Sequence, residues 1–140
     1  MILLDTSGVL AALFPDQPFH AECLEVLEAA QAPFILSPFV LAELDYLVAK
    51  YGGIEPELAL LEDIADGAYL LAPFGSEDVA EARKLVDQFQ DLELGLADAS
   101  LAVLARRHRT RDVLTLDQRH FRALPAADYQ PFRILPADLG

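Results

Sequence analysis

The chain has 140 residues, of which 54% are hydrophobic, so it can bury one sizeable core but is too short to bury two. We therefore predict a single domain over residues 1–140. The 23 acidic residues outnumber the 10 basic ones and give a formal net charge of -13, which repels polyanions at long range and would ordinarily argue against nucleic acid as a substrate.

The apolar stretches are too short to cross a bilayer. Charged residues such as Glu43, Asp45 and Lys50 interrupt the longest one, and none approaches the ~20 residues that a membrane span needs. The first residues lack the basic region and cleavage site of a signal peptide. Cys23 is the single cysteine, and its helical spacing from apolar neighbours predicts a core position. We expect a soluble cytoplasmic protein without a membrane partner.

Short apolar runs alternate with segments whose apolar residues recur at helical spacing. This alternation predicts an α/β fold: a three-layer α/β/α sandwich around a mostly parallel sheet of four or five strands. In chain order we predict a strand over 2–4, helices over 9–14 and 18–31, a strand over 34–36, helices over 38–51 and 56–65, a strand over 68–72, helices over 76–89 and 96–108, a strand over 112–117, a helix over 119–123 and a strand over 132–135.

Two serines mark expected helix starts. Ser37 precedes Pro38, which is the pattern of an N-cap followed by proline at the first helical position. Ser76 can cap a later helix in the same way. An acidic connection over residues 90–95 then leads into the helix over 96–108.

Four acidic residues fall at comparable places in these elements. Asp5 and Asp117 each follow a strand, and Glu43 and Asp98 each lie early in an amphipathic helix. Ligands of open α/β sheets bind beyond the carboxyl ends of the strands. If the first strand and the strand over 112–117 are neighbours, Asp5 and Asp117 face one cleft.

Such a set of carboxylates suits a hard cation. Mg²⁺ and Mn²⁺ prefer carboxylate and water oxygens, and a metal held this way supports phosphodiester hydrolysis. The hydroxyls of Thr6, Ser7 and Thr115 are placed to orient the acids or a metal-bound water. Without a cation, the clustered carboxylates would repel each other, and at least one should hold a proton.

Each acid also has a structural interpretation. Asp5 and Asp117 could cap the helices that follow them, and the dipole favours Asp98 in a first turn. Glu43 could pair with Lys50 or with an arginine. Spacing alone does not separate three further acids from the site: Asp45, Asp91 and Glu93.

Most of the basic residues are clustered near Asp117. The cluster either contacts phosphates or forms a solvated helix end whose charges complement the dipole. The three histidines are scattered along the chain, and we interpret each as a cap, a surface residue or a helix-end cation. The cluster comprises Arg106, Arg107, Arg109, Arg111, Arg119 and Arg122, and the histidines are His20, His108 and His120.

Four segments follow one another along the chain: Leu3-Leu4-Asp5-Thr6-Ser7, Ser37-Pro38 through Leu41-Ala42-Glu43-Leu44, Leu94-Gly95-Leu96-Ala97-Asp98-Ala99-Ser100, and Leu114-Thr115-Leu116-Asp117 with Arg119-His120-Phe121. Together they resemble the PIN-domain family and, more narrowly, the VapC-type toxins of bacterial toxin–antitoxin pairs. The resemblance implies a small α/β/α sandwich and a Mg²⁺- or Mn²⁺-dependent ribonuclease. It also implies that Asp5, Glu43, Asp98 and Asp117 form the catalytic, metal-binding site, with Thr6 and Thr115 contributing hydroxyls.

The resemblance also implies a division of roles. Asp5 and Asp98 are expected to bind metal directly, Glu43 to bind metal or orient the attacking water, and Asp117 to complete the site directly or through water. Hydrolysis would leave a 5′-phosphate and a 3′-hydroxyl. The arginines expected to grip RNA phosphates are Arg106, Arg107, Arg109 and Arg119.

The expected partners follow from the same resemblance. They are the RNA substrate and a cognate VapB-like antitoxin that covers the cleft, with the toxin forming a homodimer and a heterotetramer or larger assembly with the antitoxin. An acidic chain suits a basic partner segment. Aromatic candidates for the antitoxin groove, which could equally be core residues, are Phe14, Phe19, Phe39, Tyr46 and Tyr51.

Other classes remain as alternatives. A PIN-like protein could bind metal or a partner without cleaving RNA, although the complete acid set argues against this. A phosphoryl-accepting receiver needs a late lysine, whereas the lysines are Lys50 and Lys84. A haloacid-dehalogenase-like phosphatase needs Asp-x-Asp after the first strand, but position 7 is Ser7.

Overall fold

The computed structural model describes residues 1–30 and 33–139. It contains a five-stranded sheet in the order β3-β2-β1-β4-β5, with every neighbouring pair parallel. The predicted α/β class and parallel sheet are therefore confirmed. The strands are β1 (Ile2–Leu4), β2 (Phe34–Leu36), β3 (Leu70–Leu71), β4 (Asp112–Leu114) and β5 (Arg133–Leu135).

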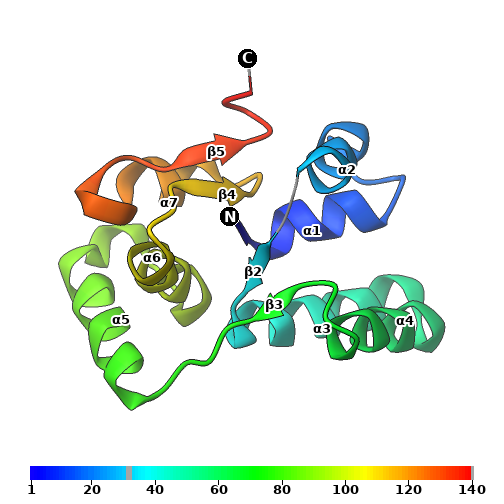
Figure 1. Cartoon of the computed structure of the whole chain (residues 1–140), viewed down its shortest axis with the longest axis horizontal. Coiled ribbons are helices and arrows are strands. Elements are labelled where there is room, and N and C mark those ends of the chain that lie inside the picture. The colour runs from blue at the N-terminus through cyan, green and yellow to red at the C-terminus, as the bar shows by residue number, and fades with distance from the viewer. Residues whose placement is uncertain (31–32, 140) are drawn as a thin grey trace.

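The helices cover both faces of this sheet (Figure 1). Those numbered α1 to α4 lie on one side and α5 to α7 on the other, as right-handed crossovers require when the chain first proceeds from β1 to β3 and then returns to β4. The helices are α1 (Thr6–Leu13), α2 (His20–Ala29), α3 (Pro38–Gly52), α4 (Ile54–Ala65), α5 (Ser76–Gln88), α6 (Leu96–His108) and α7 (Gln118–Ala123), with short 3₁₀ turns η1 (Gln90–Leu92) and η2 (Ala127–Tyr129).

The central strands and α6 form the core. The strands β1 and β2 are buried along their whole length, as expected for parallel strands covered on both faces. Leu101 and Leu104 of α6 are fully buried beneath them. Phe121 of α7 packs edge-to-face against Phe132, with ring centroids 5.3 Å apart.

The neighbouring strands β1 and β4 set the position of the site. Leu4 pairs with Leu114 at their carboxyl ends, so the segments after both strands emerge side by side. From β1 the chain continues into α1 on one face, and from β4 into α7 on the other (Figure 1). This is a topological switch point, where open α/β sheets bind ligands. Because β1 and β4 are neighbours, Asp5 and Asp117 face one cleft, as the sequence predicted under this condition.

Several boundaries differ from the prediction. The strand predicted over 68–72 is reduced to Leu70–Leu71 at the exposed sheet edge, and β4 ends at Leu114 rather than 117. Two helices begin earlier than predicted, α1 at Thr6 and α4 at Ile54. The helix predicted to reach Gln31 ends at Ala29 in the structure, and its predicted last residue lies outside the described part.

Two other expectations concern burial and membranes. Cys23 is fully buried against the core, as predicted. Within residues 1–30 and 33–139, no helix has the length and apolar character needed to traverse a lipid bilayer.

Candidate functional site

Asp5 lies at the carboxyl end of β1 and is buried, with 5% of its surface exposed. Its Oδ2 accepts hydrogen bonds from Oγ1 of Thr115 at 2.6 Å and from Oγ of Ser7 at 3.3 Å. Burial raises the pKa of Asp5 by more than these hydrogen bonds lower it. Asp5 occupies the N-cap position of α1, but its side chain makes no capping hydrogen bond. The capping interpretation therefore does not explain the position of its carboxylate.

Thr115 orients both sides of the switch point. Besides donating to Asp5, its Oγ1 accepts a 2.9 Å hydrogen bond from the backbone N–H of Asp117. Its hydroxyl also lies 3.2 Å from that of Ser7, and Ser7 in turn accepts from the backbone N–H of Leu116 at 2.9 Å. The hydroxyls therefore fix the loop after β4 against the start of α1.

Glu43 reaches the same region from α3. It is exposed, and its Oε1 accepts a 2.8 Å hydrogen bond from Oγ1 of Thr6. The partner predicted from sequence was Lys50 or an arginine; in the described residues no ion pair involves Glu43. A hydroxyl orients the carboxylate without neutralising it, which leaves its charge available to a cation.

Asp98 shows that the four acids converge. It lies in the first turn of α6, with 20% of its side chain exposed. Burial, followed by the negative charges of Asp5, Asp117 and Glu43, raises the pKa of Asp98 to about 6, although His120 opposes this shift. The charges of all four acids chosen from sequence therefore act on one region, although only Asp98 and Asp117, together with His120, place ligand atoms within 4.8 Å of one another.

Asp117 serves the site and also caps α7. Its Oδ1 accepts a 3.0 Å hydrogen bond from the backbone N–H of His120, so the capping interpretation of this residue is correct. Its Oδ2 faces the site, 2.7 Å from Nδ1 of His120. One carboxylate thus combines a local structural role with a position beside Asp98.

His120 is a site residue that the sequence interpretation missed. Its Nε2 lies 2.8 Å from the carbonyl oxygen of Leu92, and its Nδ1 lies 3.2 Å from Oδ2 of Asp98. Burial alone would lower the pKa of His120, but the Leu92 carbonyl and the carboxylates of Asp117 and Asp98 raise it. The available signal was its position three residues after Asp117, which places both on one side of α7.

A buried serine pair joins the helices that carry Glu43 and Asp98. Oγ of Ser100 donates to the carbonyl oxygen of Ala97 at 2.6 Å, so the 2.7 Å hydrogen bond to it comes from Oγ of Ser37. Ser37 also caps α3 by accepting from the backbone N–H of Phe39 at 3.2 Å. The N-termini of α3 and α6 are therefore locked together.

The three further acids that spacing alone did not separate from the site, Asp45, Asp91 and Glu93, do not contribute to the raised pKa of Asp98. Asp45 instead acts on Glu57 of α4, whose pKa is raised by the neighbouring Asp45 carboxyl. Asp91 contributes its backbone carbonyl oxygen to a 3.5 Å hydrogen bond from Arg119. Glu93 is exposed at the end of η1 with a left-handed backbone, φ 53°.

Most members of the arginine cluster lie away from Asp98. Residues 106–109 end α6, about 12 Å or more along the helix axis from its first turn. Arg107 is held by Asp78 and the Pro73 carbonyl oxygen, each at 2.6 Å, and Arg106 lies over the Tyr129 ring at 5.1 Å. Arg119, on α7, is the member closest in sequence to Asp117. RNA binding by this cluster stays a prediction.

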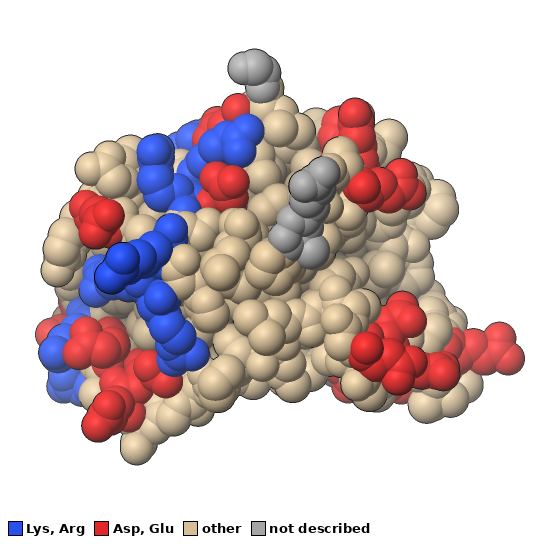
Figure 2. All heavy atoms as spheres, in the orientation of Figure 1, with Lys and Arg blue, Asp and Glu red and all other residues tan. Residues whose placement is uncertain are grey.

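The charges divide the molecular surface. On the face shown in Figure 2, the visible Lys and Arg side chains lie over the half that contains α5, α6, α7 and β5. The other half, with α2 and α4, shows acidic side chains without basic ones. A polyanion approaching this face is therefore favoured on the side of α7.

The donor set fits a divalent cation. One ligand atom each from Asp98, Asp117 and His120 lies within 4.8 Å of the others. Burial, followed by neighbouring carboxylates, raises the pKa values of Asp5 and Asp98. Carboxylate oxygens with one imidazole nitrogen suit Mg²⁺, Mn²⁺ or a similar ion. Such a cation would relieve the repulsion and favour the ionised forms of Asp5 and Asp98.

Comparison with known proteins gives matches over most of the chain. Residues 2–126 match the PIN domain family. Ribonuclease VapC26 of Mycobacterium tuberculosis is 42% identical over 135 residues, which cover 96% of this chain and 100% of that protein.

Solved structures share the fold. The M. tuberculosis toxin VapC20, described as cleaving the sarcin–ricin loop, has a TM-score of 0.79 at 16% identity and covers 86% of this chain and 92% of its own. A toxin–antitoxin complex from Klebsiella pneumoniae has a TM-score of 0.67 at 22% identity and covers 89% and 93%. FitAcB from Neisseria gonorrhoeae has a TM-score of 0.59 at 25% identity and covers 86% and 91%.

Proposed function

This chain belongs to the PIN-domain family and, within it, to the VapC-type toxin ribonucleases, and we propose that Asp5, Glu43, Asp98 and Asp117 form the site at which it hydrolyses RNA. The main support is the environment of Asp98, whose pKa is raised first by burial and then by the charges of the other three acids. Their places in the fold also support the proposal, because Asp5 directly follows β1 and Asp117 lies in the loop after the neighbouring strand β4, while Glu43 and Asp98 lie early in α3 and α6.

Members of this family use a divalent metal ion, and we propose Mg²⁺ or Mn²⁺ here. Asp5 and Asp98 would hold it directly, with Asp117 completing the site directly or through water, and the adjacent His120 fits the same donor set. When bound, the ion polarises a phosphoryl oxygen and favours ionisation of a bound water. Comparing metal affinity across the four single carboxylate-to-amide variants tests this ranking, because equal losses in all four would contradict it.

The surrounding residues hold the acids in place. Thr115 and Ser7 orient the buried carboxylate of Asp5, and Thr6 orients Glu43. Glu43 is the most exposed of these carboxylates, and in this proposal it orients the attacking water and accepts its proton. Holding the catalytic carboxylates in position accelerates hydrolysis, because the reacting groups need no further ordering to reach the transition state.

The proposed reaction is hydrolysis of one phosphodiester bond. Water adds to phosphorus, the bond from phosphorus to the 3′-oxygen breaks, and that oxygen is protonated as it leaves. The products carry a 5′-phosphate and a 3′-hydroxyl. Among the arginines predicted to bind phosphates, Arg119 has the best position, because it follows Asp117 by two residues on α7.

We propose a cognate VapB-like antitoxin as the protein partner. The K. pneumoniae relative is a toxin–antitoxin complex, and an acidic chain with a net charge of -13 suits a basic antitoxin segment. Of the five aromatic groove candidates, Phe19, Tyr46 and Tyr51 are exposed, whereas Phe39 stacks edge-to-face on Phe74. We also propose a homodimer that assembles with antitoxin into a heterotetramer or larger complex.

The decisive experiment is cleavage of total cellular RNA by partner-free protein with Mg²⁺ or Mn²⁺. We expect discrete products with 5′-phosphate ends that disappear with a chelator. Asp98→Asn should slow cleavage at least about 100-fold, because a metal contributes several kcal/mol to such a transition state. The matched control is Asp91→Asn, which removes the charge of an exposed acid outside the four proposed site acids and should leave the rate of cleavage unchanged.

The same experiment separates the enzyme from a non-catalytic PIN-like binding protein. Calorimetric titration with Mn²⁺ should accompany the cleavage assay. If the protein binds Mn²⁺ but cleaves no RNA with either Mg²⁺ or Mn²⁺, the result would support the non-catalytic binding protein and contradict the proposed nuclease. Equal activity of wild type and Asp98→Asn would show that Asp5, Glu43, Asp98 and Asp117 do not form the active site.

A further inference from the structure

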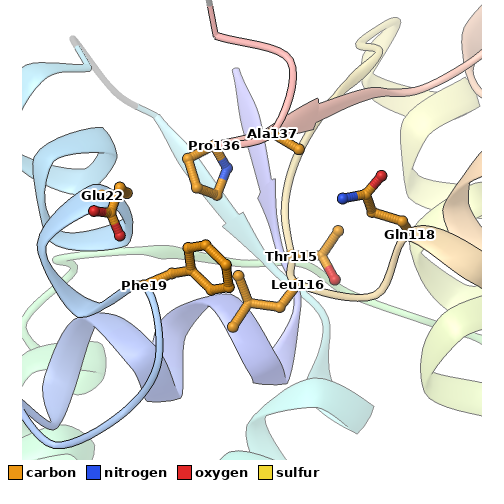
Figure 3. A pocket seen from close by; sticks show the side chains of 7 residues that line it. All are labelled: Phe19, Glu22, Thr115, Leu116, Gln118, Pro136 and Ala137. Atoms are coloured by element: carbon orange, nitrogen blue, oxygen red, sulfur yellow. The ribbon is translucent and has the colours of Figure 1, made fainter.

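A pocket of about 210 Å³ opens beside the proposed active site, where Thr115 and Gln118 contribute to its lining. Figure 3 shows Phe19 and Leu116 on one side and Pro136 with Ala137 facing them, while Glu22 and Gln118 stand at opposite ends. The apolar walls come from three places in the chain: the start of α2, the loop after β4 and the segment after β5. Two facing apolar walls, which include the rings of Phe19 and Pro136, with polar groups at the ends suit a planar ligand with polar edges.

The pocket adjoins the proposed active site. Thr115 lines it and also donates the 2.6 Å hydrogen bond to Asp5. Gln118, another lining residue, directly follows Asp117. A group bound in this pocket is therefore adjacent to the acids, within reach of an RNA strand whose scissile phosphate lies over them.

Phe19 is held at the pocket by an unusual backbone. Its φ is 61° and its ψ 23°, a left-handed conformation that is disfavoured for a bulky residue. Nevertheless, 60% of its surface is exposed, so core packing does not explain the conformation. Strain of this kind is concentrated at functional sites, and here it places an exposed aromatic ring against the pocket.

The polar ends present complementary groups. The Oε1 of Gln118 accepts a 3.3 Å hydrogen bond from Nη2 of Arg122, which leaves the N–H groups of its amide for the pocket, toward which they point in Figure 3. Glu22 presents a carboxylate, which only accepts hydrogen bonds when ionised. The pocket thus offers donors at one end and acceptors at the other, and the carboxylate disfavours a phosphate.

We propose that this pocket binds one unpaired nucleobase of the RNA substrate, stacked on Phe19, and that it favours guanine. The proposal rests on the proposed ribonuclease function. Proteins read single-stranded RNA by stacking bases on aromatic rings and bonding to their edges. Guanine has two adjacent N–H donors on its Watson–Crick edge, which match the carboxylate of Glu22, and an O6 acceptor for the amide of Gln118.

A fluorescence experiment tests base binding without catalysis. The chain contains no tryptophan, so Phe19→Trp introduces a single indole at the pocket. In the presence of chelator, the RNA tetranucleotide UUGU should quench this fluorescence at a concentration at least 5-fold lower than UUUU. The matched control is Leu58→Trp, at an exposed site on α4, which neither RNA should quench.

Cleavage assays give the second readout. Phe19→Ala should lower kcat/KM on a guanine-containing RNA between about 5- and 150-fold, which corresponds to the loss of one stacked base. Phe19→Tyr should retain activity because it keeps the ring, and neither variant should change Mn²⁺ affinity. Glu22→Gln should reduce the preference for guanine over uracil in both assays.

The outcomes separate this proposal from the nuclease itself. If wild type cleaves RNA, but UUGU leaves the Phe19→Trp fluorescence unchanged and Phe19→Ala cleaves like wild type, the base pocket is wrong and the nuclease stands. If UUGU quenches the indole and wild type cleaves no RNA, the pocket stands and the nuclease is wrong. Equal quenching by UUUU and UUGU would contradict the preference for guanine.

Discussion

The hydroxyl of Thr6 donates a 2.8 Å hydrogen bond to Oε1 of Glu43, although the two residues are 37 positions apart. Thr6 begins α1 directly after Asp5, and Glu43 lies in the second turn of α3. The hydrogen bond therefore couples the position of one proposed catalytic carboxylate to the segment that carries another. Groups that orient metal ligands or catalytic acids in this way influence activity without contacting the substrate.

Replacing Thr6 with Val should reduce RNA cleavage by about 10- to 100-fold, because loss of an orienting partner has effects of this size. Valine keeps the shape of the side chain but lets Glu43 rotate toward water. We expect Mn²⁺ affinity to change less than kcat, since Asp5 and Asp98 remain in place. Thr6→Ser, which restores the hydroxyl, should recover most of the activity.

Thr110 provides the control for this variant. It is equally buried, with 8% exposed like Thr6, but its hydroxyl donates to the carbonyl oxygen of Met1 at 2.7 Å, beside the amino end of β4. Thr110→Val should lower the midpoint of urea unfolding and leave kcat unchanged. Similar activity losses in Thr6→Val and Thr110→Val would show that general destabilisation, not orientation of Glu43, explains the effect.

The metal-free protein should become less stable as pH rises from about 4 to 7. The pKa of Asp98 is raised to about 6 in the folded chain from an ordinary 3.8, so over this range the folded state binds more protons than the unfolded state. The stability contributed by protonated Asp98 is therefore lost as pH passes through 6. His120, with its raised pKa, contributes in the same direction at higher pH. Urea unfolding in chelator at pH 5 and pH 7.5 measures the change.

Two additions isolate the contribution of Asp98. Asp98→Asn removes the titrating group, so its unfolding midpoint should depend less on pH than that of wild type. Adding Mn²⁺ should stabilise wild type more at pH 7.5 than at pH 5, because protons compete with the ion for the carboxylates. A wild-type midpoint that rises steadily from pH 5 to 7.5 in chelator would contradict the assignment.

The positions of the four acids could be predicted because they depend on regular features. Asp5 follows a strand that is entirely apolar, and Asp98 occupies the first turn of a helix whose bounds, Leu96–His108, match the predicted range. Once strands alternate with helices, handedness leaves few possible topologies. Only the pairing of β1 with β4 had to come from the structure.

His120 and the pocket at Phe19 depend on tertiary geometry that periodicity does not encode. His120 becomes a site residue because η1 brings the Leu92 carbonyl to one side of its ring and α6 brings Asp98 to the other. Phe19 was predicted as a groove or core residue, since a left-handed backbone at a phenylalanine has no sequence signature. The extent of β3 was overestimated because apolar residues near a sheet edge need not be paired.

The two serines predicted as helix caps should respond differently to substitution by alanine. Ser37 caps α3 and donates to Ser100 in the core, so Ser37→Ala should destabilise the protein by about 1–2 kcal/mol. Ser76 lies inside α5, where the backbone N–H of Gly75 is instead bound by Asp78 at 2.9 Å. Ser76→Ala should therefore change stability by less than about 0.5 kcal/mol. Urea unfolding of both variants tests this, and equal losses would contradict the observed caps.

Gly8 sets how closely α1 approaches β4, and this contact positions Asp5 against Thr115. A Cβ at position 8 would lie 2.6 Å from the carbonyl oxygen of Leu114 and 2.7 Å from its Cγ. Because the nearest atom belongs to a buried backbone, Gly8→Ala should cost about 1–3 kcal/mol or more and separate the helix from the strand. Gly75→Ala is the matched control, since no atom lies within 4 Å of its added Cβ. Urea unfolding and Mn²⁺ titration of both variants should show a loss in Gly8→Ala alone; a stable Gly8→Ala variant with normal metal affinity would show that the contact between α1 and β4 does not hold the site together.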